Sequence, residues 1–253
     1  SRLSLLWWGS AKFIVIFANF LKLMRYLTVV FLMLFCLQRG TSQTFELGGF
    51  IGGANVIGDV GNTSYINPNT LAFGGIFKWN RSERHSFRFS AILAKVEGND
   101  ADSKETRRQQ RGYSFQNNIK EFSAGLEYTF WEFNLNSGAP VAAPYLYTGI
   151  TYFLNQASLI DTQGDTTQYN QTGAFAIPMV LGYKATLSTK LIGAFEIGAR
   201  YAFTDNIDAS NPSQGDDQQQ DLKFGNQNNN DWYVFTGITF SFTFGREPCY
   251  CNF

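Results

Sequence analysis

Histidine and recognisable catalytic motifs are scarce in this chain. His85 is the only histidine among the 253 residues, and it lies in a short polar connection. A turn residue is a simpler interpretation of His85 than a general base. The sequence also has no Gly-x-Ser-x-Gly motif, which presents the nucleophile of many hydrolases. These absences disfavour a hydrolase, and we expect a protein that is not an enzyme and needs no cofactor.

Cysteine is rare, and the net charge is zero. The chain has three cysteines, and its 20 Lys and Arg residues balance its 20 Asp and Glu residues. Five of the basic residues and none of the acidic ones precede Gln43. This leaves 15 basic and 20 acidic residues from Gln43 onward, a net charge of −5 for that part. A concentrated basic surface for nucleic acid is therefore not expected.

The first 42 residues have the pattern of a targeting sequence rather than of a folded domain. Met24-Arg25 begins a short basic region, Tyr26 to Leu37 is a hydrophobic run, and small residues follow it. This order predicts a secretory signal peptide over residues 24–42, preceded by an upstream extension at residues 1–23. The alternative is an N-terminal membrane helix from Leu5 to Leu37, interrupted by three basic residues.

The rest of the chain alternates between large apolar and small polar residues. In Trp232–Gly245, for example, Ile238, Phe240, Phe242 and Phe244 share one face, whereas Gly, Ser and Thr dominate the other. A period of two residues is that of a β-strand. We expect eight such strands, at Thr44–Val56, Thr70–Trp79, Ser86–Val96, Ile119–Phe133, Pro144–Asn155, Ala174–Thr186, Leu191–Phe203 and Trp232–Gly245.

The connections between these strands alternate in length. Long connections rich in Asn, Asp, Gln, Gly and Ser lie at residues 57–69, 97–118, 156–173 and 204–231. The others are shorter. This pattern predicts an all-β domain over residues 43–245, an eight-stranded antiparallel up-and-down transmembrane β-barrel of the OmpA/OmpX-like kind. We expect it in the bacterial outer membrane, in contact with lipid, with short periplasmic turns, long outer loops and both termini in the periplasm.

The small-residue faces of the strands carry a few charged side chains. A secreted lipocalin-like barrel would instead bury its apolar face and expose long charged residues on the other. A cramped membrane-barrel interior requires small residues and paired charges. We therefore predict a network of ion pairs that fills the lumen, formed by Lys78, Arg88, Glu127, Lys184, Glu196 and Arg200. Aromatic residues at strand ends are expected to form two interfacial girdles, at Phe77, Trp79, Phe130, Trp131, Phe133, Trp232 and Tyr233.

Two loop features have simple interpretations as solvated segments. Six aspartates in the 204–231 connection match the spacing of no calcium loop, so we expect no metal site and a mobile polar loop. They are Asp205, Asp208, Asp216, Asp217, Asp221 and Asp231. A basic cluster in the 97–118 connection either stays solvated or meets lipopolysaccharide phosphates or an acidic partner. It comprises Lys104, Arg107, Arg108 and Arg111.

Residues 246–253, which follow the last strand, are expected to form a periplasmic tail that contains two cysteines. Cys249 and Cys251 are separated by one residue, and a disulfide across that spacing is strained. Two thiolates also make an incomplete zinc site. A labile pair, a metal site and a bond to another protein all remain open, and we favour an intermolecular disulfide to a periplasmic partner.

Several motifs together resemble the PorG-like barrels of Bacteroidota, outer-membrane components of the type IX secretion and gliding machinery. They are Phe45-Glu-Leu-Gly-Gly-Phe-Ile-Gly-Gly-Ala-Asn55, the following Gly58-Asp-Val-Gly61, the signal ending in Thr-Ser-Gln and the Cys-x-Cys tail. The resemblance implies a non-catalytic anchor for a periplasmic lipoprotein ring of PorK- and PorN-type proteins, or GldK- and GldN-type proteins in gliding bacteria. The alternative is a solitary OmpX- or OmpW-like barrel for adhesion, surface binding or passage of small hydrophobic molecules.

Overall fold

The structure is a computed structural model that describes residues 44–134, 139–211, 224–225 and 229–245. The predicted upstream extension, the signal peptide and the Cys249 and Cys251 tail lie outside these residues. So do three of the six loop aspartates, Asp216, Asp217 and Asp221.

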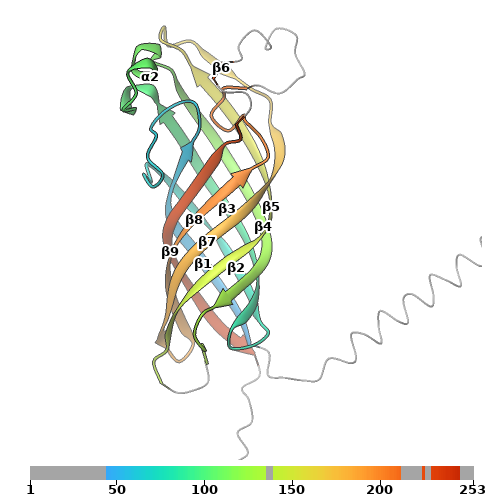
Figure 1. Cartoon of the computed structure of the whole chain (residues 1–253). Coiled ribbons are helices and arrows are strands. Elements are labelled where there is room, and N and C mark those ends of the chain that lie inside the picture. Colours follow the sequence, from blue (N-terminus) through green and yellow to red (C-terminus); the bar gives the residue numbers. More distant parts are fainter. Residues whose placement is uncertain (1–43, 135–138, 212–223, 226–228, 246–253) are drawn as a thin grey trace, which may run out of the picture. The chain divides into compact units, whose positions relative to one another are not determined.

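Eight long strands close into one antiparallel barrel (Figure 1). Each strand pairs with its neighbours in sequence, β1 pairs with β9, and β4 pairs with β5. A short ninth strand, β6, pairs only with the end of β5. The strands are β1 (Thr44–Ile57), β2 (Thr70–Asn80), β3 (His85–Asn99), β4 (Ser114–Thr129), β5 (Ala142–Ile160), β6 (Thr166–Gln168), β7 (Thr172–Ser188), β8 (Leu191–Ala202) and β9 (Trp232–Gly245).

The two ends of the barrel differ. One end, here called the turn end, carries the short connections and the paired ends of β1 and β9, where Thr44 lies opposite Gly245. The other end, the loop end, carries the four long connections (Figure 1). The predicted up-and-down barrel of eight strands is therefore confirmed. The alternation of connection lengths is partial, because the connection at residues 130–141 of the turn end is as long as the one at residues 58–69 of the loop end.

The strands project further toward the loop end than the sequence suggested. β4 begins at Ser114 rather than Ile119, and β5 continues to Ile160 rather than ending at Asn155. The 19 residues of β5 exceed the roughly 10 that a strand needs to cross a bilayer. The strands are therefore longer than is needed to cross the apolar layer of a bilayer, and the extra length lies at the loop end.

Helical structure is confined, within the described residues, to the connection between β3 and β4. It consists of the 3₁₀ turn η1 (Asp100–Asp102) and the helix α2 (Thr106–Arg111). None of the helical segments that the structure describes has the length and apolar character needed to cross a membrane.

Large apolar side chains cover the outside of the wall, whereas the inside holds small and polar ones. Phe73, Phe122, Ile150, Leu181 and Phe242 are each at least half exposed. On the inner face of β9, by contrast, Thr239, Ser241 and Thr243 are buried. Burying such an exterior in lipid is favourable, whereas leaving it in water is not. The lipocalin-like arrangement, with the apolar face inside, is therefore wrong.

The predicted aromatic girdle is partly wrong. Phe130 and Trp131 are exposed near the turn end, but Phe133 and Tyr233 are buried. Tyr233 occupies an inward position of β9, two residues before the inward-facing Phe235. Phe133 follows the end of β4, packs with Ala143 under the lumen, and closes the turn end. Both aromatic side chains therefore fill the interior.

The connection between β8 and β9 is also different from the expected solvated loop. Within its described part, Ile207, Asp208, Ala209 and Ser210 are buried, and so is Asp231. Ile207 and Ala209 belong to the same apolar cluster as Phe115 and Tyr233 on the strands. The described part of this connection therefore folds into the mouth of the barrel.

Candidate functional site

Glu127 is at the centre of a buried ion-pair cluster in the lumen. One of its carboxylate oxygens lies 2.7 Å from Lys78 Nζ and 3.8 Å from Arg88 Nη1, and the other lies 2.9 Å from Lys184 Nζ. Arg88 also forms a bidentate pair with Glu196, with nitrogen–oxygen distances of 2.7 and 2.9 Å. All five side chains are almost completely buried. The cluster joins residues from five strands across the interior.

The strand register brings these charges together. Lys78 on β2 lies directly opposite Arg88 on β3, and Glu46 on β1 lies opposite Lys78. Residues that face each other on adjacent strands have their Cβ atoms about 5 Å apart. Two cations therefore lie side by side, with Glu46 Oε2 at 3.9 Å from Lys78 Nζ. The carboxylates of Glu127 and Glu196 offset the repulsion between the Lys78 and Arg88 cations.

Arg200 forms a second cluster, closer to the loop end. Its guanidinium lies 3.2 and 3.3 Å from the two oxygens of Glu121 and 4.3 Å from the ring centre of Phe235. The Tyr233 hydroxyl donates a 2.8 Å hydrogen bond to the same carboxylate. Aromatic rings therefore pack around the ion pair and leave little room for water.

The structure thus brings five of the six predicted lumen charges into one cluster and places Arg200 in another. Glu46, Glu121 and Tyr145 complete the two clusters, and sequence reasoning missed them. The Tyr145 hydroxyl donates a 2.7 Å hydrogen bond to Glu196. Strand parity could have identified Glu121, because it shares the inward face of β4 with Glu127. The two clusters, within the described residues, then hold four cations and four carboxylates.

Asp208 ties the connection between β8 and β9 to the connection that follows β1. Its carboxylate accepts hydrogen bonds from the backbone N–H groups of Asp59 and Val60, the latter at 3.1 Å. Asp231 holds the same segment from the other side by accepting a 2.8 Å hydrogen bond from the N–H of Ile207. We refer to the packed connections at the loop end, which are those between β1 and β2, between β3 and β4, and between β8 and β9, as the outer cap.

Because Gly58 has no side chain, the carboxylates of Asp208 and Asp231 can both lie against its backbone. A Cβ atom at this position would lie 2.5 Å from an oxygen of Asp208 and 2.7 Å from an oxygen of Asp231. Both carboxylates therefore lie against the backbone of the same residue. Only glycine permits that approach without displacing one of them.

Asp100 and Arg111 fasten the rest of the outer cap. The fully buried carboxylate of Asp100 accepts hydrogen bonds from Gly61 N and Tyr113 N and pairs with Arg111 at 2.8 Å. Arg111 also donates a 2.7 Å hydrogen bond to the carbonyl of Asp59. Two distant connections are thereby joined through one ion pair.

The predicted basic cluster is therefore divided. Arg108 donates hydrogen bonds to the carbonyl oxygens of Gly58 and Gly61, and Arg111 is turned into the outer cap. Lys104 and Arg107 are exposed, as a solvated loop would have them. The interpretation of the cluster as wholly solvated is wrong for Arg108 and Arg111.

Burial perturbs the acids of the outer cap. It raises the pKa of Asp205 to about 6, and it raises the pKa of Asp208 above its ordinary value and that of Asp231 well above it. Neighbouring carboxylates add to this effect, since the charge of Asp208 further raises the pKa of Asp231. The outer cap therefore favours the protonated forms of these acids.

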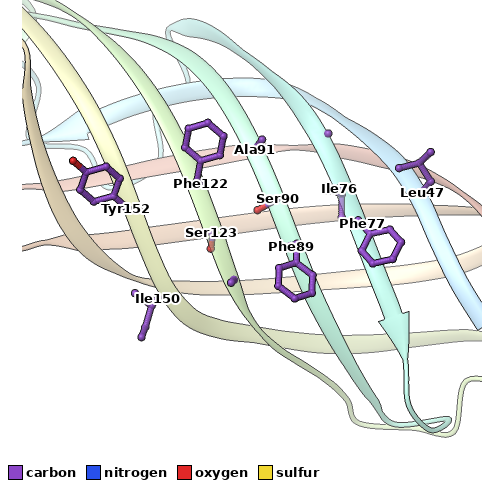
Figure 2. Close-up of a pocket in the computed structure, with 12 residues that line it drawn as sticks. Leu47, Ile76, Phe77, Phe89, Ser90, Ala91, Phe122, Ser123, Ile150 and Tyr152 are labelled. Atoms are coloured by element: carbon purple, nitrogen blue, oxygen red, sulfur yellow. The ribbon is translucent and has the colours of Figure 1, made fainter. Parts of the chain in front are cut away.

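A shallow apolar groove crosses the outside of the wall, on β1 to β5 (Figure 2). Its volume is about 550 Å³. Small residues on three adjacent strands line it (Gly75, Ala91 and Ala124), among the larger side chains of Leu47, Phe77, Phe89, Phe122, Ile150 and Tyr152. A groove of this character can accept an acyl chain or an apolar membrane segment.

Catalytic and metal-binding geometry is sparse in the described residues. His85 lies at the turn end, where its ring Nδ1 is 3.2 Å from the Ser82 hydroxyl and its ring packs on Tyr128. Within the parts of the chain that the structure covers, no group of three or more His, Cys, Asp or Glu side chains is placed to hold a metal ion. The structure thus gives His85 the contacts of a turn residue.

Comparison with known proteins identifies a family. The model of a family described as a domain of unknown function, DUF6089, matches residues 24–253. No curated protein matches the sequence.

Solved structures of similar architecture are outer-membrane barrels. Ail, the attachment invasion locus protein of Yersinia pestis, has 8% identity and a TM-score of 0.44, over 81% of this chain and 100% of Ail. A major outer membrane protein of Thermus thermophilus has 14% identity and the same TM-score and coverage. OprG of Pseudomonas aeruginosa has 10% identity and a TM-score of 0.39, over 81% of this chain and 97% of OprG.

Proposed function

The chain belongs to the DUF6089 family, and we propose that it is a non-catalytic outer-membrane anchor that does not conduct. The observation that carries this proposal is the closed interior. The lumen is filled by ion pairs around Glu127 and Glu121, and the outer cap packs over the loop end. An eight-stranded barrel is already too narrow for a water channel. Its working surfaces are therefore its two ends and its lipid-facing wall.

The location follows from the same wall. The apolar exterior requires a bilayer, and closed transmembrane β-barrels are typical of the bacterial outer membrane. In the proposed orientation, the short connections and both ends of the barrel sequence face the periplasm. The pairing of Thr44 with Gly245 supports the placement of both ends of the barrel sequence on the same side of the membrane.

We further propose that the anchor docks a periplasmic assembly of the type IX secretion and gliding systems. This finer proposal rests on the resemblance to PorG-like barrels and on the Cys249-x-Cys251 segment, which begins four residues after Gly245, the last residue of β9. The partner would be a lipoprotein ring of PorK- and PorN-type proteins, or GldK- and GldN-type proteins. An intermolecular disulfide through Cys249 or Cys251 would fasten it.

The test is purification of the tagged protein from native outer membranes in mild detergent. Samples are separated without and with reductant, for the unaltered chain, for a Cys249→Ser, Cys251→Ser variant, and for Tyr250→Phe as the matched control. A stoichiometric partner that reductant releases, that the serine variant loses and that the control keeps is the expected result. A barrel that elutes alone at its own mass in every sample would contradict docking.

A second candidate is a solitary surface-binding barrel. The observation that favours it is the outer cap, because Asp100, Asp208 and Arg111 hold the outer connections in defined positions. Ordered outer loops suit recognition of an external molecule. Loss of surface binding on deletion of the outer connection 58–69, together with unchanged binding after deletion of the Cys-x-Cys tail, would favour this candidate.

A further inference from the structure

A small polar pocket lies at the loop end, beside the outer cap. Its volume is about 330 Å³, near the lower limit of roughly 300 Å³ for small-molecule sites. The end of β1, the connection 58–69 and residues 97–102 form its walls. Five of its ten lining residues are asparagines, Val56 is the one large apolar residue, and none is aromatic.

The walls of this pocket are fixed by its own residues. Asn55, only 4% exposed, donates a hydrogen bond to the carbonyl of Tyr65 and accepts one from the N–H of Asn67. Asn69 Nδ2 donates a 2.9 Å hydrogen bond to the carbonyl of Glu97. The connection 58–69 is thereby fastened to β1 on one side and to β3 on the other. A ligand would therefore meet a pocket that is already formed.

Several polar groups of the pocket remain available. Within the described residues, hydrogen bonds use neither the side-chain amide of Asn67 nor the carboxylate of Asp102. Asn99 uses its Oδ1 to accept from Ala101 N, which leaves its Nδ2 as a donor. Asn69 uses its Nδ2, which leaves its Oδ1 as an acceptor. Donors and acceptors are thus mixed in one small volume.

We propose that this pocket binds a saccharide. A hydroxyl group donates and accepts at once, so a ring of hydroxyls matches mixed amides and carboxylates. The carboxylates of Glu97 and Asp102 repel an anion, and within the described residues no group of three or more His, Cys, Asp or Glu side chains is placed to hold a metal ion. An apolar ligand would leave most of the polar lining without hydrogen-bond partners. The proposal holds whether or not the barrel docks a periplasmic partner.

The sugar can come from two sources. One is a free saccharide, and the other is the carbohydrate of an outer-leaflet glycolipid, since the pocket lies at the end proposed to face outward. Without an aromatic platform, binding rests on hydrogen bonds alone, each of modest net strength. Weak binding of that kind suits a sugar that is locally abundant.

The experiment uses the purified full-length barrel in detergent micelles, without any partner protein. Saturation-transfer NMR measures the binding of D-glucose, D-galactose, D-mannose and N-acetyl-D-glucosamine. The pocket variant is Asn67→Leu with Asp102→Leu, because neither substitution removes a hydrogen bond within the described chain. The matched control is Asn170→Leu, an exposed asparagine between β6 and β7. The heat-dependent gel mobility of each variant confirms that the barrel has folded.

We expect at least one sugar to bind, roughly tenfold or more weakly to the pocket variant and equally to the control. A second arm compares lipopolysaccharide with lipid A in nanodiscs. Retention of lipopolysaccharide alone, lost in the pocket variant, assigns the glycolipid source and also supports the proposal. No binding in either arm, or binding that the pocket variant leaves unchanged, would overturn it. Because no partner is present, failure here is distinguishable from failure of the docking proposal.

Discussion

Replacing Glu127 by Gln should destabilise the barrel strongly. Lys184 has Glu127 as its only ion-pair partner within the described residues, at 2.9 Å, and is almost completely buried. Arg88 and Lys78 keep other carboxylates, Glu196 at 2.7 Å and Glu46 at 3.9 Å. The substitution therefore leaves the Lys184 ammonium without its counter-charge and removes the closer of the two carboxylates that pair with Lys78.

The magnitude follows from the geometry. At an effective dielectric constant of about 20, the attraction across the 2.9 Å pair is about 6 kcal/mol. Desolvation of both ions offsets much of this attraction in the intact protein. Removing one partner leaves the desolvation of the other uncompensated, which typically costs about 3–5 kcal/mol. We expect Glu127→Gln to lower the free energy of unfolding by about that amount.

The assay is urea unfolding of the barrel in phospholipid vesicles, followed by tryptophan fluorescence. The matched control is Glu132→Gln, because Glu132 pairs with Arg84 at 3.1 Å but both side chains are well exposed. Such pairs contribute little. A loss for Glu127→Gln no larger than that for Glu132→Gln would refute the reasoning.

A second variant separates the ion pair from general disruption of packing. Adding Lys184→Met to Glu127→Gln removes the unpaired ammonium, so we expect the double variant to be more stable than Glu127→Gln alone. Removing both charges of a buried pair avoids the cost of leaving one of them uncompensated. A double variant less stable than both single variants would show that another interaction of Lys184, such as its contact with Phe133 at 4.7 Å, dominates.

Three further predictions concern the outer cap and the lumen. Because the pKa of Asp205 is raised to about 6 and that of Asp208 is raised as well, the outer cap should be most stable at low pH. The outer cap should lose stability as the pH rises from about 4 through 6, because the same carboxyl groups ionise at lower pH in the unfolded segment. Hydrogen exchange at the amide of Val60 measures this pH dependence, and Asp208→Asn should reduce it. An equal pH dependence in the variant and the unaltered chain would contradict the prediction. Arg111→Met should accelerate exchange at the amide of Gly61, which donates to Asp100, by about tenfold or more, whereas Arg107→Met should not. In planar bilayers the purified barrel should give no single-channel steps, and reproducible steps would show that the lumen opens.

Strand periodicity accounts for most of what the sequence could predict. The eight barrel strands and the inward positions of Lys78, Glu127 and Arg200 follow from a period of two residues. The up-and-down order follows from the lengths of the connections. The predictions for Phe133 and Tyr233 were wrong because they relied on the preference of aromatic residues for membrane interfaces. They did not consider whether each side chain faces into or out of the barrel. For Tyr233, the same parity that places Phe235 inside gives the observed answer.

The outer cap could not be predicted in this way. Asp208 bonds to Val60 across 148 residues, and Asp100 bonds to Gly61 across 39. No local pattern encodes such pairs, and a polar connection rich in Asn and Asp has the composition of a solvated loop. The burial of Ile207 and Ala209 depends on a mouth that exists only after the barrel has closed.

The seam between β1 and β9 has a mechanical consequence. The two strands pair in antiparallel register from Thr44 opposite Gly245 to Ile57 opposite Trp232. A load applied beyond Gly245, as by a tethered assembly, pulls β9 along its own axis. The hydrogen bonds that β9 makes to β1 and β8 lie perpendicular to that pull, so they share the load in shear instead of breaking one after another. A barrel closed in this way would bear a sustained tension at its C-terminal end with little stretching.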